Sequence, residues 1–161
     1  MKPTRFPMFS LVMLAVCTFL AATSAIGQEK KEKSLYQRLG GYDAIAAVVD
    51  DFVPRLVGDP TLTKFFTGHG TESKMRIRQL VVDQLCEATG GPCVYIGRTM
   101  KASHGGLGIT EENWNAAVKH LVASIDKFKV PQKEKDELLA IASSLKADIV
   151  APTAGSEMMK K

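Results

Sequence analysis

Apolar residues recur at every third or fourth position in four stretches of the chain, which is the spacing of one face of an α-helix. These stretches cover residues 45–56, 77–88, 114–128 and 138–149. Pro54 lies inside the first stretch, so we expect that helix to bend or to end early. Thr110 precedes the third stretch and is followed by Glu111 and Glu112, a pattern typical of a helix N-terminus. No stretch alternates convincingly with a period of two, and the sequence therefore predicts an all-α domain.

Residues 1–27 have the composition of an export signal. Lys2 and Arg5 supply a positive start, residues 9–22 are apolar, and small residues follow. We expect cleavage after residue 27 and a periplasmic or secreted protein. The alternative is an uncleaved anchor, because the uncharged run 8–26 is long enough to span a bilayer and would hold the domain at the outer side of the membrane.

Two further segments flank the predicted folded unit. Residues 28–33 form a charged spacer. Residues 151–161 carry no apolar period, and we expect them to be a flexible tail. The domain that carries the apolar stripes is therefore residues 34–150.

Composition and charge exclude several classes of protein. The chain has 161 residues, of which 45% are hydrophobic and 24% charged, the balance of a globular protein rather than of a disordered one. Its net charge is +4, and Lys2 and Arg5 in the predicted signal account for two of these charges, which leaves +2 on the rest. Nucleic-acid-binding domains concentrate basic residues on one face, so this small excess does not indicate one.

A short segment rich in glycine, residues 95–109, lies between the second and third predicted helices. Met100, Ser103, His104 and Leu107 share one side of it if it turns as a helix. A histidine on an apolar face is most often an ordinary core residue. The alternative is a haem site, because a helical domain that directs one imidazole into an apolar crevice can hold haem iron through a single axial ligand.

Several motifs, in order along the chain, resemble those of the group I truncated haemoglobins. They are 34–41 (SLYQRLGG), 51–52 (DF), 65–66 (FF), 90–92 (GGP), 95–98 (YIGR), 100–104 (MKASH), 108–110 (GIT), 120–121 (HL) and 147–150 (ADIV). The resemblance covers nearly all of the predicted domain. It implies a two-over-two helical sandwich around one b-type haem, with His104 as the proximal ligand of the iron.

Six apolar residues are candidate walls of the haem pocket, with plain core packing as the alternative for each. They are Phe52, Phe66, Leu85, Met100, Leu107 and Ile109. Arg98 and Lys101 could meet the haem propionates, although a solvated surface charge is the better default. The sequence contains no Cys-x-x-Cys-His motif, so we expect one haem b per chain, bound non-covalently.

The distal side is where the sequence departs from the family pattern. Many relatives carry a tyrosine directly after the Asp-Phe pair, and its hydroxyl donates to the gas ligand, but this chain has Val53. The positions where relatives often place glutamine fall on Ile77 and Val81. We therefore expect an unusually apolar distal pocket. The alternative is that Gln79 or Gln84 supplies the donor, if the helix register is shifted.

The remaining two histidines are not expected to bind iron. His69 lies in a Thr-Gly-His-Gly-Thr loop sequence, and we interpret it as solvated rather than as a second iron ligand. His120 matches a position of the family pattern that does not bind iron, so we interpret it as structural.

Cys86 and Cys93 flank the Gly-Gly-Pro turn. In an oxidising compartment two such cysteines favour a disulfide. The alternative is two free thiols, because spacing alone does not establish the approach of the two Cα atoms.

Two classes of function follow from these observations. The first is an exported haem protein that reversibly binds a diatomic gas, namely O2, CO or NO. The second is an enzyme that consumes nitric oxide or peroxide with electrons from a reductase or another external donor. A third and weaker interpretation is a helical interaction module without haem.

Overall fold

The computed structural model describes residues 32–152 of the chain. Their α-helices are Leu35–Leu39 (α1), Tyr42–Gly58 (α2), Thr71–Ala88 (α3), Met100–His104 (α4), Glu111–Lys127 (α5), Gln132–Ser144 (α6) and Lys146–Ile149 (α7), with a 3-10 helix at Thr63–Phe66 (η1). No β-strand occurs between residues 32 and 152, and the predicted all-α class is confirmed.

The predicted export signal, residues 1–27, lies outside the described residues, as do most of the spacer 28–33 and nearly all of the tail 151–161. The fold described below belongs to the compact unit that starts at Lys33. Within the described part of the chain, no helix has both the length and the apolar character needed to cross a bilayer.

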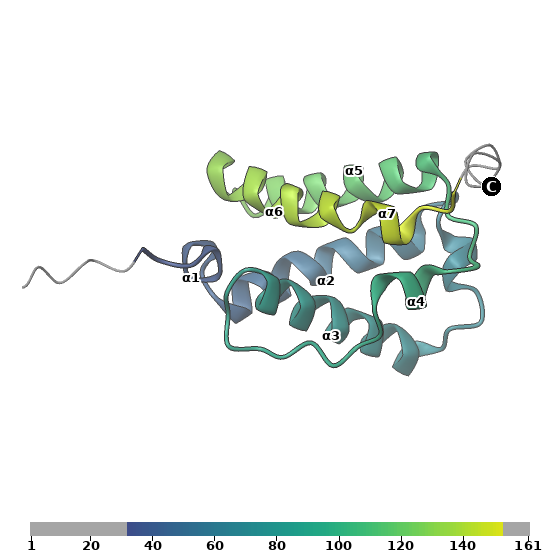
Figure 1. The fold of residues 1–161 in the computed structure, drawn as a ribbon, viewed down its shortest axis with the longest axis horizontal. Helices are drawn as coiled ribbons and strands as arrows, with labels where there is room; N and C mark the ends of the chain where they lie inside the picture. The colour runs from purple at the N-terminus through teal and green to yellow at the C-terminus, as the bar shows by residue number, and fades with distance from the viewer. Residues whose placement is uncertain (1–31, 153–161) are drawn as a thin grey trace, which may run out of the picture. The chain divides into compact units, whose positions relative to one another are not determined.

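The long helices form two layers (Figure 1). One layer holds α2 and α3, which pack against each other, and the other holds α5 and α6, with α7 following α6. Helix α2 also packs against α5, so it joins the two layers. The short helix α4 contacts α7 and is carried on the loop that returns from the end of α3.

Two apolar clusters hold these layers together. The first lies between α2 and α3 and includes Val49 and Val82, both fully buried. The second lies between α2, α5 and α6 around Ile125, which is also fully buried. Apolar side chains are therefore buried at both faces of α2, and each buried side chain of this size stabilises the fold by about 1.5–3 kcal/mol. These contacts hold the two layers together.

Local signals at the helix ends operate largely as the sequence predicts. The Thr110 hydroxyl accepts a hydrogen bond from the backbone N–H of Asn113, and the Asn113 side chain accepts one from the backbone N–H of Thr110, so α5 starts with a capping box. Of the two alternatives expected at Pro54, a bend or an early end, the early end is wrong, because α2 continues to Gly58. The single apolar stripe at 138–149 is divided between α6 and α7.

Candidate functional site

A cavity of about 660 Å³ is bounded by residues from both layers. Its lining includes residues of α2, η1, α3, α4, α5, α6 and α7 and of the loops between them, and most of these side chains are apolar. Pockets for cofactors and drug-sized ligands typically have volumes of about 300–1,000 Å³ and a few polar groups in an apolar wall. The size and the lining therefore suit a large, mainly apolar cofactor.

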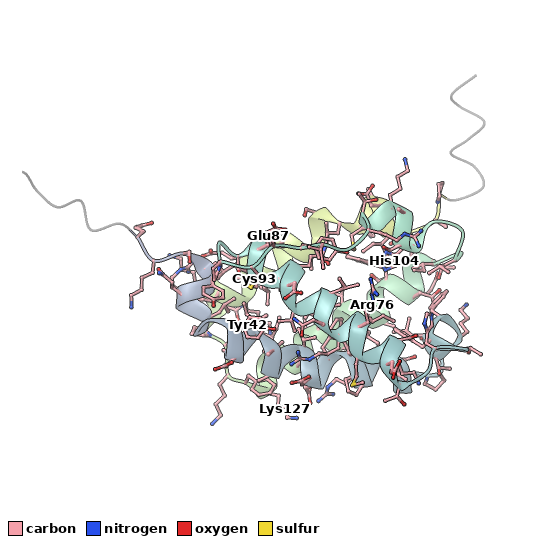
Figure 2. The ribbon with its side chains drawn as sticks, turned by 90° about the horizontal axis from the view of Figure 1, so that it is seen from below. Tyr42, Arg76, Glu87, Cys93, His104 and Lys127 are labelled. Carbon is pink, nitrogen blue, oxygen red and sulfur yellow. A yellow bond between two sulfur atoms is a disulfide. The ribbon has the colours of Figure 1, made fainter. Side chains whose placement is uncertain are left out.

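His104 is the last residue of α4 and is half-buried at this cavity (Figure 2). Its Nδ1 lies 2.9 Å from the carbonyl oxygen of Met100, one helical turn earlier. A carbonyl oxygen accepts hydrogen bonds only, so Nδ1 is the donor, and the tautomer with this proton has its lone pair on Nε2. This is the arrangement in which an imidazole binds a metal through one nitrogen while the other is held by a backbone carbonyl.

The start of α4 is fixed by a second local contact. The Thr99 hydroxyl accepts a hydrogen bond from the backbone N–H of Ala102, which caps this five-residue helix. The Arg98 guanidinium donates to the carbonyl oxygen of Ala102, and Arg98 also lines the cavity. Lys101 is exposed and does not line the cavity, so of the two basic residues considered for the propionates only Arg98 lies there.

The structure brings the predicted wall residues together around this one cavity. Those that line it are Phe52 from α2, Phe66 from η1, Leu85 from α3, Met100 from α4, and Leu107 and Ile109 from the loop after α4. Ile77 and Val81 of α3 also line it, one helical turn apart. The apolar face of α3 therefore forms one wall of the cavity.

Val53 is the exception, and the expectation that it lines the distal pocket is not met. Val53 is absent from the cavity lining and is buried in the cluster with Val49 and Val82. The reason is geometric. Successive residues of a helix point about 100° apart, so Phe52 faces the cavity while the short side chain of Val53 packs between α2 and α3.

The two glutamines that the sequence leaves open as donors have different surroundings. The Gln79 amide donates to the Tyr42 hydroxyl and to the Asp83 carboxylate, and Gln79 does not line the cavity. Gln84 does line it, one turn beyond Val81 and next to Leu85. Gln84 is therefore the only one of the two at the cavity.

His69, for which the loop composition predicts a solvated side chain, is exposed and also lines the cavity. It lies in the loop between η1 and α3, and its backbone N–H donates to the carbonyl oxygen of Phe66. The glycine-rich composition around it correctly predicts a loop, but composition gives no sign that this loop borders the cavity. Trp114 and Val118 of α5 are lining residues as well, and their only sequence signal is the apolar stripe.

His120 takes a structural position away from the cavity lining. Its Nε2 lies 2.7 Å from a carboxylate oxygen of Asp59, the residue that caps the end of α2. The hydroxyl and backbone N–H of Thr61 also donate to Asp59. The Thr61 hydroxyl, followed by His120, lowers the pKa of Asp59 from 3.8 to about 2. This network ties the α2–η1 corner, which contributes Phe65 and Phe66 to the cavity, to α5.

Cys86 and Cys93 form a disulfide, with Cα atoms 5.7 Å apart. Of the two alternatives that the sequence leaves open, the structure therefore has the bridge. Cys86 is fully buried in the cluster between α2 and α3, on the opposite side of α3 from the cavity lining.

Comparison with known proteins agrees with this geometry. The family model described as bacterial-like globin matches residues 34–151. The group 1 truncated hemoglobin GlbN of Mycolicibacterium paratuberculosis is 34% identical over 122 residues, which are 76% of this chain and 88% of that protein. The chain belongs to the group 1 truncated haemoglobins.

Other relatives of this globin give the same assignment. The group 1 truncated hemoglobin LI410 of Chlamydomonas moewusii is 30% identical over 132 residues, which are 80% of this chain and 75% of the relative. Among solved structures, the truncated hemoglobin of Tetrahymena pyriformis in its Fe(III) form has a TM-score of 0.68 at 22% identity and covers 74% of this chain and 100% of its own. The 2/2 hemoglobin of Synechococcus sp. PCC 7002, solved with covalently attached heme, has a TM-score of 0.66 at 27% identity and covers 73% of this chain and 98% of its own. The predicted two-over-two fold is therefore confirmed.

The cavity of this globin fits the haem that membership of the family implies. Its volume and apolar walls suit a macrocycle, and the Nε2 of His104 has no hydrogen-bond partner among residues 32–152. Arg98 lines the cavity and would offer its positive charge to a propionate. His104 would hold the iron, and the apolar side chains of α2, α3 and α5 would enclose the ring.

Proposed function

We propose that this globin reversibly binds a diatomic gas, namely O2, CO or NO, at one b-type haem ligated by His104. The observation that carries the proposal is the hydrogen bond between His104 Nδ1 and the Met100 carbonyl oxygen, at the edge of a large apolar cavity. The haem supplies the iron that binds the gas, and the protein supplies one oriented imidazole and a wall that excludes water.

The distal wall supports an apolar site for the gas. Helix α3 presents Ile77, Val81 and Leu85 to the cavity, and none of these side chains donates a hydrogen bond. A gas that gains little from a donor, such as CO or NO, is favoured relative to O2 in such a site. Gln84 is the amide side chain that α3 contributes to the lining, and its effect is tested below.

Non-covalent attachment of the haem is supported by the cysteines. Cys86 and Cys93 are bonded to each other, so neither offers a thiol for a thioether link. Extraction into acidified organic solvent tests this point, and we expect the haem to leave the protein completely. Haem that stays with the polypeptide would contradict it.

Export is the second part of the proposal, with the domain periplasmic or secreted. The Cys86–Cys93 disulfide supports it, because such bonds persist in oxidising compartments and are rare in the cytosol. Expression of the full chain, fractionation and N-terminal sequencing test it. We expect a mature chain that starts at Gln28, and an intact N-terminus in the membrane fraction would instead indicate an anchor.

Absorption spectra of the purified protein in the ferric, ferrous and carbonmonoxy states test the central proposal. We expect a Soret band in each state and a shift on addition of CO. A protein that folds but takes up no haem would overturn it. Steady consumption of nitric oxide or peroxide with an electron donor would instead assign the globin to the enzymes.

A further inference from the structure

The stretch that carries the proximal histidine is weakly attached to the rest of the protein. Residues 92–99 connect α3 to α4 and run back along α3 (Figure 1). Within the described part of the chain, residues 92–98 make no backbone–backbone hydrogen bond. The side-chain bonds of this stretch are local, from the Tyr95 hydroxyl to the Arg98 carbonyl oxygen and from Arg98 to Ala102.

Burial of side chains also contributes little to the attachment of this stretch. Val94 is 69% exposed and Ile96 is 82% exposed, so the largest aliphatic side chains here contribute little packing. Helix α4 has no buried residue, and its main helix contact is with α7. The conformation of the segment that ends at His104 therefore depends on a small number of attachment points.

The disulfide is the strongest of these points. Cys93 lies near the start of this stretch, and His104 ends the helix α4 that follows it, as the labels in Figure 2 show. Cys93 is bonded to Cys86, whose side chain is fully buried between α2 and α3. A covalent bond therefore joins the exposed stretch to the buried cluster between α2 and α3.

Cys86 belongs to the helix that forms one wall of the cavity, although its own side chain faces the opposite side of that helix. Leu85, the residue before Cys86, lines the cavity, and so does Ala88, two residues after it. The close fit of the turn between the two cysteines adds to the constraint, since a Cβ on Gly91 would lie 2.7 Å from the Cys86 sulfur. The two ends of the bond are thus connected to the α3 wall on one side and to the His104 segment on the other.

We propose that the Cys86–Cys93 disulfide is a thiol-reducible clamp that positions the His104 segment, and that its reduction weakens retention of the haem. The proposal rests on the proposed function, because it takes His104 as the iron ligand. A low-molecular-weight or protein dithiol is the co-reactant. Its first thiolate attacks the sulfur of Cys93, the more exposed of the two, and releases the Cys86 thiolate, which takes up a proton. Its second thiolate then displaces Cys93, so two electrons reduce the bridge to two thiols and the dithiol becomes a disulfide.

The expected size of the effect follows from other groups that orient metal ligands. Loss of an outer contact that fixes a metal-binding histidine typically costs about 10–100-fold in metal affinity. The disulfide acts on His104 through the stretch of chain between them, so we expect the lower end of this range, about tenfold faster loss of haem.

Haem transfer to excess apomyoglobin measures this rate. Three forms of the full-length ferric protein are compared, namely the oxidised protein, the protein reduced by a dithiol that is then removed without air, and Cys93→Ser. The Cys93→Ser variant keeps the sulfur of Cys86 in the core, so it opens the bridge without placing a hydroxyl there. Ile96→Ser is the matched control, because it changes an exposed residue of the same stretch and leaves the bridge intact.

Two further readouts separate positioning from a general loss of stability. We expect reduction to shift or broaden the iron–histidine stretching band of the ferrous protein in resonance Raman spectra, while far-UV circular dichroism keeps its helical signal. In haem-free protein, we expect reduction to speed up amide hydrogen exchange in residues 93–104 more than in α2 or α5.

Each result decides between the alternatives. The clamp would be overturned if reduction left the rate of haem loss within twofold and the iron–histidine band unchanged within error. It would also be overturned if reduction raised amide exchange equally in every helix. If no form of the protein takes up haem, the proposed function fails. The exchange experiment then still decides whether the bond holds the segment, and equal protection in both redox states would overturn that part too.

Discussion

The Nδ1 atom of His104 lies 2.9 Å from the carbonyl oxygen of Met100, within a helix of only five residues. The proposed iron ligand and the group that orients it therefore belong to the same helical turn, and the ring orientation is set locally. The rest of the protein has to place this turn against the cavity, and the Thr99 cap, α7 and the disulfide contribute to that placement.

His104→Ala should abolish the five-coordinate ferrous spectrum and reduce haem retention by at least about 100-fold, because the iron loses its protein ligand. Added imidazole should restore part of the spectrum, since it occupies the space of the missing ring. His69→Ala is the matched control, as it removes the other cavity histidine and should leave the ferrous spectrum unchanged. Equal haem retention in His104→Ala and the unaltered protein would contradict the assignment.

Val81→Gln should slow the release of O2 by about 10–100-fold, because a hydrogen bond to a partly charged ligand is worth about 1–3 kcal/mol. Val81 lines the cavity on α3, so an amide at this position reaches the space that the gas occupies. Stopped-flow measurement of O2 displacement by CO gives the rate. Val81→Leu, which adds volume without a donor, should leave the release within about threefold of the original.

Gln84→Leu tests whether the native cavity already has a donor. If the distal site is as apolar as proposed, O2 release from this variant should stay within about threefold of that from the unaltered protein, because no hydrogen bond to the gas is lost. The same stopped-flow assay applies. Release that becomes tenfold faster would show that Gln84 contacts the gas.

Val53→Tyr should destabilise the protein by about 1–3 kcal/mol, because the larger ring would overpack the cluster between α2 and α3. Val53 is 7% exposed and contacts its neighbours in this cluster instead of the cavity. Urea unfolding monitored by circular dichroism measures the change. A Val53→Tyr variant of unchanged stability with slower O2 release would show that this position does reach the haem.

The contribution of Asp59 to stability should depend on acid pH. Its pKa falls from 3.8 to about 2 in the folded protein, chiefly through the Thr61 hydroxyl and then through His120. A lowered folded-state pKa favours the charged form, so the stabilisation is complete above about pH 4 and is lost as the pH falls toward 2. Urea unfolding of the protein and of Asp59→Asn should therefore differ most near pH 6 and converge only as the pH falls to about 2. A difference that is constant across this range would contradict the coupling.

The sequence by itself determines much of the fold and singles out His104 as the proposed iron ligand. Apolar residues at helical spacing specify α2, α3, α5 and α6, because an amphipathic helix buries one stripe. The cap at Thr110 and the motif around His104 are local, and local chemistry can be predicted from a few neighbouring residues. The glycine, proline and aromatic motifs then identify the globin family.

The tertiary structure decides which side chains meet. Phe52 and Val53 are both apolar and adjacent in the sequence. Only the packing of α3 and α5 against α2 shows that Phe52 faces the cavity and that Val53 faces the core. In the same way, Gln79 is bound by Tyr42 and Asp83 while Gln84 reaches the cavity. The position of His69 at the cavity and the approach of Cys93 to Cys86 depend on the paths of two loops, and the apolar pattern of the helices does not predict these paths. A stripe fixes the direction of a side chain relative to its own helix axis, whereas the group it meets depends on how the helices pack in three dimensions.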